Sequence, residues 1–232
     1  MPYPVDEDKA RNDICSVCRM MYDQGLIGGP AGNVSARIGP ERVLLTPSMP
    51  FKQFLQPEQI IAVDLDGRRV GPETEANRGL RPSSELPTHL DTYRLRPDIG
   101  GIVHAHPTYC VALSTAGIAL RTNVLIEGMV YLGFVPTADY GMPTTQDLSD
   151  TVAEFIVDHN AVVMSYHGAL TVGEDVMQAY ARMEVLEQVA QIQCIVESLG
   201  GEKPLPRDQI AKLLELRRAM GHAAAGDAGL LE

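Results

Sequence analysis

An apolar segment of the chain ends in a histidine pair and a proline. Residues 101–106 read Gly-Ile-Val-His-Ala-His, and Pro107 follows. This run predicts a strand, because apolar residues lie between a glycine and a residue that cannot continue a ladder. Side chains of a strand alternate between its two faces, so His104 and His106 point the same way, roughly 6 to 7 Å apart. That separation suits two imidazoles on one metal ion.

A second apolar segment ends in a similar way. Residues 161–164 are Ala-Val-Val-Met, and His167 and Gly168 come shortly afterwards. Because both segments give way to turn-forming residues, we expect the three imidazoles to gather where strands pass into loops. The alternative is that the histidines are simply hydrogen-bonded in a polar rim.

Length and composition indicate one ordinary globular domain. The chain has 232 residues, of which 45% are hydrophobic and 21% charged, which is enough for one substantial core. We expect a single domain over residues 1–222 and a flexible tail over residues 223–232, which are small and polar. The net charge of −11 argues against nucleic acid or an anionic membrane as a partner, since both require a basic surface.

The chain also lacks the usual signals for membranes and for disulfides. No apolar run approaches the roughly 20 residues of a membrane span, and the first residues lack a basic region followed by an apolar one. We therefore expect a cytoplasmic protein. Cys15 and Cys18 invite a redox or zinc interpretation, but they fall inside a predicted helix and have no second pair. Core packing is the preferred interpretation for both.

Hydrophobic periodicity and turn residues divide the chain into alternating elements. The first two predicted strands are separated by Gly39-Pro40, which indicates a hairpin. The predicted helices cover residues 8–25, 84–95, 146–158, 174–199 and 206–220. The predicted strands cover residues 34–38, 43–46, 60–64, 101–106 and 161–166.

Two serines and a glutamate stand at the start of the second predicted helix. Ser84 is a good N-cap, and the free N–H groups of a helix start, together with the hydroxyls of Ser83 and Ser84, favour a phosphate or carboxylate there. The alternative is a plain capping arrangement. Glu85, if it lies near the metal, has two compatible roles. It can be a fourth ligand at rest and a general base once substrate displaces it.

Six short motifs occur in the order and approximate spacing of a known family. They are Gly32-Asn33-Val34-Ser35, Thr46-Pro47-Ser48, Pro82-Ser83-Ser84-Glu85, Arg96-Pro97-Asp98, Val103-His104-Ala105-His106 and His167-Gly168. With these motifs the chain resembles the class II aldolase and adducin family over roughly residues 9–220. Each motif alone is weakly specific, whereas six in order are strongly so.

The resemblance implies a fold, an assembly and a set of site residues. The implied fold is a three-layer α/β/α arrangement with a largely antiparallel central sheet. The implied assembly is a homotetramer with active sites between subunits. The implied cofactor is a divalent metal, usually zinc, with manganese, cobalt or iron as alternatives. By the same similarity the metal ligands are His104, His106, His167 and Glu85, the catalytic acid/base is Glu85, and the residues that hold substrate phosphate are Asn33, Ser48, Ser83 and Ser84.

The resemblance further implies a lyase of carbohydrate metabolism. The aldolases of the family cleave a ketose 1-phosphate to dihydroxyacetone phosphate and a small aldehyde through a metal-stabilised enediolate. Other members decarboxylate β-keto or hydroxy-aromatic acids. Met49 replaces a phosphate-loop glycine and Met220 falls near an expected tyrosine, which favours decarboxylation, whereas Asn33 and Ser83-Ser84 favour the aldolase. A third alternative is a non-catalytic scaffold of the adducin kind, which need not keep the metal ligands.

Overall fold

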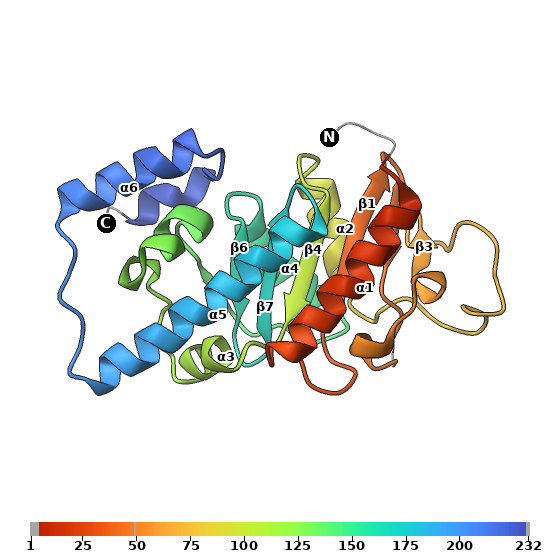
Figure 1. Ribbon diagram of the computed structural model, residues 1–232, viewed down its shortest axis with the longest axis horizontal. Coiled ribbons are helices and arrows are strands. Elements are labelled where there is room, and N and C mark those ends of the chain that lie inside the picture. The colour runs from red at the N-terminus through yellow and green to blue at the C-terminus, as the bar shows by residue number, and fades with distance from the viewer. Residues whose placement is uncertain (1–4, 49, 231–232) are drawn as a thin grey trace.

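Seven strands form one sheet at the centre of the structure, a computed structural model that describes residues 5–48 and 50–230 (Figure 1). The strand order is β3-β2-β1-β4-β7-β6-β5. Only β5 and β6 pair in parallel among these strands, and every other neighbouring pair is antiparallel. The strands are β1 (Asn33–Gly39), β2 (Arg42–Leu45), β3 (Ile61–Val63), β4 (Gly101–Ala105), β5 (Thr137–Ala138), β6 (Ala161–Met164) and β7 (Gly168–Gly173).

Helices cover both faces of this sheet. On one face lie α1 (Glu7–Asp23), α3 (Thr108–Thr115) and α5 (Val176–Ser198), and on the other lie α2 (Leu86–Leu95) and α4 (Gln146–Ile156). Figure 1 shows α1 and α5 crossing in front of the strands, with α2 and α4 behind them. The predicted three-layer α/β/α fold with a largely antiparallel sheet is therefore confirmed.

The alternation of side chains along β4 connects the two cores to the site. Val103 and Ala105 belong to the cluster under α1 and α5, whereas Ile102 belongs to the cluster under α2 and α4. His104 consequently points to the α2 side of the sheet. The start of α5 packs closely on this strand, because a Cβ at Gly101 would lie 2.2 Å from the backbone of Asp175.

The C-terminal part packs at the β5 end of the sheet. There α6 (Arg207–Ala219) lies beside the π-helix η4 (Gly128–Leu132) and the 3-10 helix η5 (Ala225–Leu230). The guanidinium of Arg217 is fully buried and donates to Asp227 at 2.7 Å. The expectation that residues 223–232 are flexible concerns motion and stays a prediction.

Most of the predicted elements are confirmed within about two residues. The prediction of Ser84 as an N-cap is wrong, because α2 begins after Glu85, which occupies the cap without a side-chain hydrogen bond. Three elements, β5, α3 and β7, were not predicted from the sequence. Cys15 and Cys18 are free and buried on the core side of α1, which confirms the packing interpretation.

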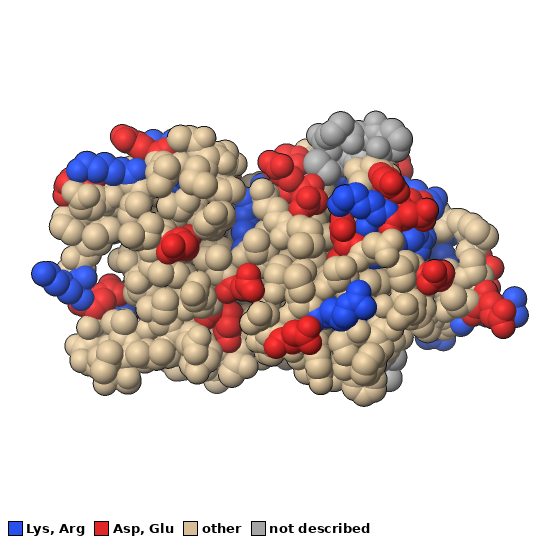
Figure 2. All heavy atoms as spheres, viewed as in Figure 1, with Lys and Arg blue, Asp and Glu red and all other residues tan. Residues whose placement is uncertain are grey.

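The described surface carries both acidic and basic side chains. No helix of the described residues is long and apolar enough to cross a membrane. On the face shown in Figure 2, basic side chains gather mainly at one end among acidic ones, and broad areas elsewhere carry neither charge. That face offers no continuous basic surface within the described part of the chain.

Candidate metal centre

The three imidazoles predicted from two distant segments lie together. His104 is the last but one residue of β4, His106 follows the strand, and His167 stands in the turn between β6 and β7. Their ring centroids are 4.9 to 5.0 Å apart and their planes are inclined by 61° to 62°, so the rings are arranged around a common centre. One ligand atom from each lies within 4.8 Å of the others. The pairing of β4 with β7 produces this arrangement, because Ala105 lies opposite Ala169.

The ring nitrogens converge in the form that binds metal. His104 Nδ1 lies 3.0 Å from the carbonyl oxygen of Ala169, which can only accept, so Nδ1 carries the proton of the neutral ring. Its Nε2 then presents a lone pair, and it lies 3.0 Å from Nε2 of His106. Burial, together with the neighbouring histidines, lowers the pKa of His106 to about 3, so that ring is neutral as well.

A tetrahedral zinc ion with bonds of about 2.0–2.1 Å separates two ligand nitrogens by about 3.3 Å. The donor set and its spacing fit a divalent cation, because such an ion satisfies several unprotonated nitrogens at once.

Glu85 contributes a carboxylate to the same cluster. Its Oε2 lies 3.1 Å from His104 Nε2 and its Oε1 lies 3.2 Å from His167 Nε2. Burial on its own would raise the pKa of Glu85, but the electrostatic interaction with the nearby His104 ring and hydrogen bonds from His167 and Asn33 lower it well below its usual range. The side chain is therefore ionised at neutral pH and lies where it can reach either a metal or a substrate.

A chain of buried hydrogen bonds holds Glu85 in place. Asn33 donates from Nδ2 to Glu85 at 3.0 Å, and its Oδ1 lies 2.5 Å from Nε2 of His89. Burial lowers the pKa of His89 to about 3, so its neutral ring donates at Nε2 and accepts at Nδ1 from Ser35, at 2.7 Å. Ser35 in turn contacts the hydroxyl of Tyr93 at 3.0 Å. Asn33, expected at the phosphate, thus contacts the carboxylate, and His89 acts on Glu85 through it.

The three serines expected at an anion line a small cleft beside the cluster. The cleft has a volume of about 120 Å³ and also includes Glu85 and His104. Ser48 and Ser83 come together because the backbones of their segments are hydrogen-bonded. The Ser48 N–H donates to the carbonyl oxygen of Arg81 at 2.8 Å, and the Ser83 N–H donates to that of Thr46 at 3.1 Å. Ser84 is exposed at its rim. Phosphate binding by these residues stays a prediction, and Met49 lies outside the described residues.

One residue of this cleft, Lys52, was not predicted from the sequence. Lys52 is 2% exposed and lies among the lining residues. A signal existed, because it is one of only four lysines and stands beside Phe51 in a short, largely apolar stretch. Lysine side chains are nevertheless usually exposed, so the sequence alone indicates an ordinary surface charge at this position.

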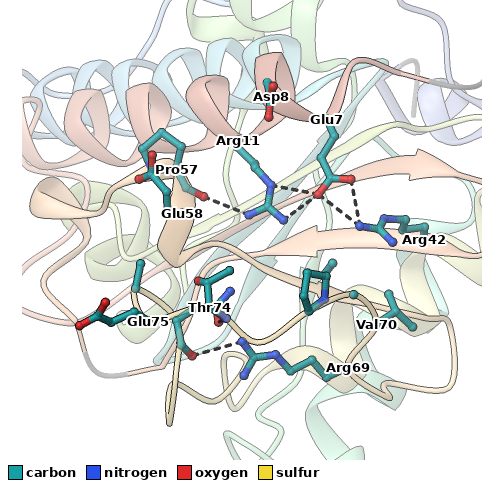
Figure 3. A pocket seen from close by; sticks show the side chains of 15 residues that line it. Glu7, Asp8, Arg11, Arg42, Pro57, Glu58, Arg69, Val70, Thr74 and Glu75 are labelled. Carbon is teal, nitrogen blue, oxygen red and sulfur yellow. Dashed lines mark hydrogen bonds and ion pairs between the residues drawn. The ribbon is translucent and has the colours of Figure 1, made fainter.

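A roomier pocket near α1 is a weaker candidate. It has a volume of about 430 Å³ and is lined by Arg11, Arg42, Glu7 and other residues (Figure 3). Arg11 binds Glu7 and the backbone oxygens of Pro57 and Ile60, and Arg42 binds Glu7 as well. Its lining residues include no histidine or cysteine. The histidine cleft is therefore the candidate site.

Comparison with known proteins identifies the family of this chain. Residues 12–194 match the family described as Class II Aldolase and Adducin N-terminal domain. The chain therefore belongs to the class II aldolase and adducin family. Within this family the chain resembles L-fuculose-1-phosphate aldolases in particular.

Three relatives illustrate the range of similar proteins. An L-fuculose phosphate aldolase of Methanococcus maripaludis is 33% identical, over 81% of this chain and 97% of its own length. A 3,4-dihydroxyphthalate decarboxylase of Arthrobacter keyseri is 31% identical, over 92% of this chain and 89% of its own. The crystal structure of an L-fuculose-1-phosphate aldolase from Thermus thermophilus has a TM-score of 0.71 at 32% identity, and covers 85% of this chain and 99% of that one. The family thus includes aldolases and decarboxylases similar to this chain.

Proposed function

We propose that this protein is a metal-dependent aldolase. It cleaves a ketose 1-phosphate similar to L-fuculose 1-phosphate, giving dihydroxyacetone phosphate and a small aldehyde. The observation that carries this proposal is the position of the Glu85 carboxylate, which lies within 3.2 Å of His104 and His167 beside a serine-lined cleft. We further propose a homotetramer in the cytoplasm, with active sites between subunits.

The residues divide into a metal-binding group and a proton-transfer group. His104, His106 and His167 would hold a divalent metal, for which zinc is the first choice, with Glu85 as a further ligand at rest. Such an ion, when bound, acts as a Lewis acid that stabilises negative charge developing on a substrate oxygen.

Glu85 would carry the proton that the reaction requires. Cleavage of the carbon–carbon bond leaves an electron pair on the carbon of the dihydroxyacetone phosphate fragment, and that carbon must gain a proton. Glu85 takes up the proton that the substrate hydroxyl loses as it becomes the aldehyde carbonyl, and delivers a proton to that carbon; in the direction of synthesis the same transfers run in reverse. The hydrogen bond from Asn33 keeps the carboxylate oriented during both steps. The hydroxyls of Ser48, Ser83 and Ser84 would bind the phosphate at the other end of the cleft.

Decarboxylation of a β-keto or hydroxy-aromatic acid is the second candidate. The decarboxylase relative aligns with more of this chain than the Methanococcus aldolase does, 92% against 81%. Met220, which replaces the expected tyrosine, caps the end of α6 and is 46% exposed. A non-catalytic scaffold is less well supported, because the three histidines and the glutamate are all present and close together.

A product assay with two panels tests the proposal. The protein is supplied with zinc, manganese or cobalt and incubated with dihydroxyacetone phosphate plus short aldehydes, and separately with β-keto and hydroxy-aromatic acids. We expect an aldol product, and we expect Glu85→Gln to reduce its formation by about 10²- to 10⁴-fold. Glu41→Gln, at an exposed residue, is the matched control and should leave the rate unchanged. Release of carbon dioxide without aldol product would replace the first proposal by the second.

A further inference from the structure

A buried cation without an acidic partner lies in the wall of the candidate cleft. Lys52 is the first residue of the 3-10 helix η1 (Lys52–Phe54), and its exposed fraction is 2%. Its ammonium donates to the carbonyl oxygens of Pro30 at 2.9 Å and Pro50 at 3.1 Å. The ammonium has three donors, and no carboxylate of the described residues lies within 4.0 Å of it.

Burial of an unpaired ammonium is energetically unfavourable. Lysine is almost never fully buried unless it is paired, because a charge loses its hydration in the interior. Burial accordingly lowers the pKa of Lys52, and the one opposing influence is the thiol of Cys18. Burial raises the pKa of that thiol, so at neutral pH it is uncharged and supplies no negative charge. Two backbone oxygens alone therefore hold the cation within the described part of the chain.

The position of Lys52 in the cleft indicates that its ammonium group can bind an anion. It lines the same cleft as Ser48, Ser83 and Ser84, whose hydroxyls are donors. Glu85, His104 and His106 line this cleft as well. The cleft thus combines hydrogen-bond donors and a fixed positive charge next to the group that moves a proton. A substrate with an anionic end is complementary to this arrangement, because charge-assisted hydrogen bonds to an ammonium are about twice as strong as neutral ones.

We propose that Lys52 binds the anionic group of the substrate, a phosphate or a carboxylate, and thereby determines which substrates enter the cleft. The assignment of the cleft to substrate rests on the proposed function. Lys52 would be a binding residue, since its cation contacts the unreactive end of the molecule. A lysine that served only to join the loops around Pro30 and Pro50 would contribute to stability alone.

Anion titrations of the protein as purified test the proposal. Inorganic phosphate and acetate are titrated calorimetrically into the wild type, Lys52→Met and Lys52→Arg. We expect one of the two anions to bind, and its affinity to fall by about 10- to 100-fold in Lys52→Met, as for a lost hydrogen bond to a charged group. Lys52→Arg should bind more tightly than Lys52→Met. The anion that depends on Lys52 identifies the group as phosphate or carboxylate.

Lys203→Met is the matched control, because it removes the same charge from an exposed lysine outside this cleft. Its anion affinity should equal that of the wild type. The proposal is overturned if Lys52→Met binds both anions as the wild type does, whatever happens to its melting temperature, or if the wild type binds neither. Thermal unfolding of each variant shows whether it is folded.

Glu85→Gln separates this proposal from the proposed function. That variant should lose turnover and keep the Lys52-dependent binding of the anion. If the wild type forms no product from either panel yet binds the anion through Lys52, the lyase assignment fails and the anion site stands. If product formation requires Glu85 while Lys52→Met binds normally, the anion site alone fails.

Discussion

Replacing Gly168 with alanine should separate the three imidazoles without removing any of them. A Cβ at this position would lie 2.3 Å from the carbonyl oxygen of Ala105, 2.9 Å from Cδ2 of His106 and 3.1 Å from Cε1 of His104. The first contact is with backbone, so no side-chain rotation relieves it. Overpacking of this kind costs about 1–3 kcal/mol. If the ligands bear that cost, metal affinity falls about 5- to 150-fold.

Competition with a chelator of known affinity measures this effect for zinc. Gly28→Ala is the matched control, because a Cβ there meets nothing within 4 Å and its metal affinity should not change. Thermal unfolding of both metal-free variants separates a loss of metal affinity from a loss of folding. Wild-type affinity in Gly168→Ala would refute the reasoning, since it would mean that the turn before β7 does not control the ligand spacing.

Three further predictions concern the surroundings of the site and the C-terminal part. His89→Leu leaves buried polar partners such as Asn33 unpaired and should cost about 2–6 kcal/mol of unfolding free energy, measured by urea denaturation. The pKa of His89 is about 3 in the folded protein, against an ordinary value of 6.5, so between these pH values the unfolded state binds one more proton than the folded state. The unfolding free energy therefore falls as the pH drops from 6.5 towards 3. In His89→Leu the proton uptake on unfolding over this pH range should be smaller by close to one proton. Asp227→Ala leaves the buried charge of Arg217 without its carboxylate and should lower the unfolding free energy by about 3–5 kcal/mol. Asp208→Ala, at an exposed ion pair, should lower it by less than about 1 kcal/mol. Equal effects of the two substitutions would contradict the packing of η5. Removal of bound metal by a chelator should lower the melting temperature. For a protein kept at a free metal concentration of about 100 times its Kd, the stabilisation lost is about 2.7 kcal/mol. An unchanged melting temperature would count against a metal site that forms on folding.

The sequence predicts the fold where a pattern repeats over a whole element. The helices now seen as α1, α4, α5 and α6 have long periodic or well-bounded sequences, and their limits are close to those expected. β7 was not predicted because Gly168, its first residue, was interpreted as the turn residue that ends the preceding strand. The turn that joins β6 and β7 into a hairpin includes Tyr166 at φ 60°. A positive φ is uncommon for a residue other than glycine, so the sequence does not indicate this turn.

The candidate site divides in the same way. The histidines could be located because strand alternation and strand ends depend on local sequence, and the carboxylate because it follows a serine pair at a helix start. The link from His89 through Asn33 to Glu85 depends on contacts between α2 and β1, which are distant in the chain, so single-sequence reasoning could not specify it. The burial of Lys52 is likewise a tertiary property.

The histidines come from two strands that pair in the sheet, His104 and His106 from the end of β4 and His167 from the turn before β7, and this has a consequence for how the protein folds. β4 and β7 are neighbours in the sheet but far apart along the chain. An ion bound by His104, His106 and His167 would act as a reversible cross-link between two segments whose association is entropically demanding, so its capture and the completion of the sheet would be cooperative. The availability of metal while the protein is being translated would then influence the yield of folded protein as well as its activity.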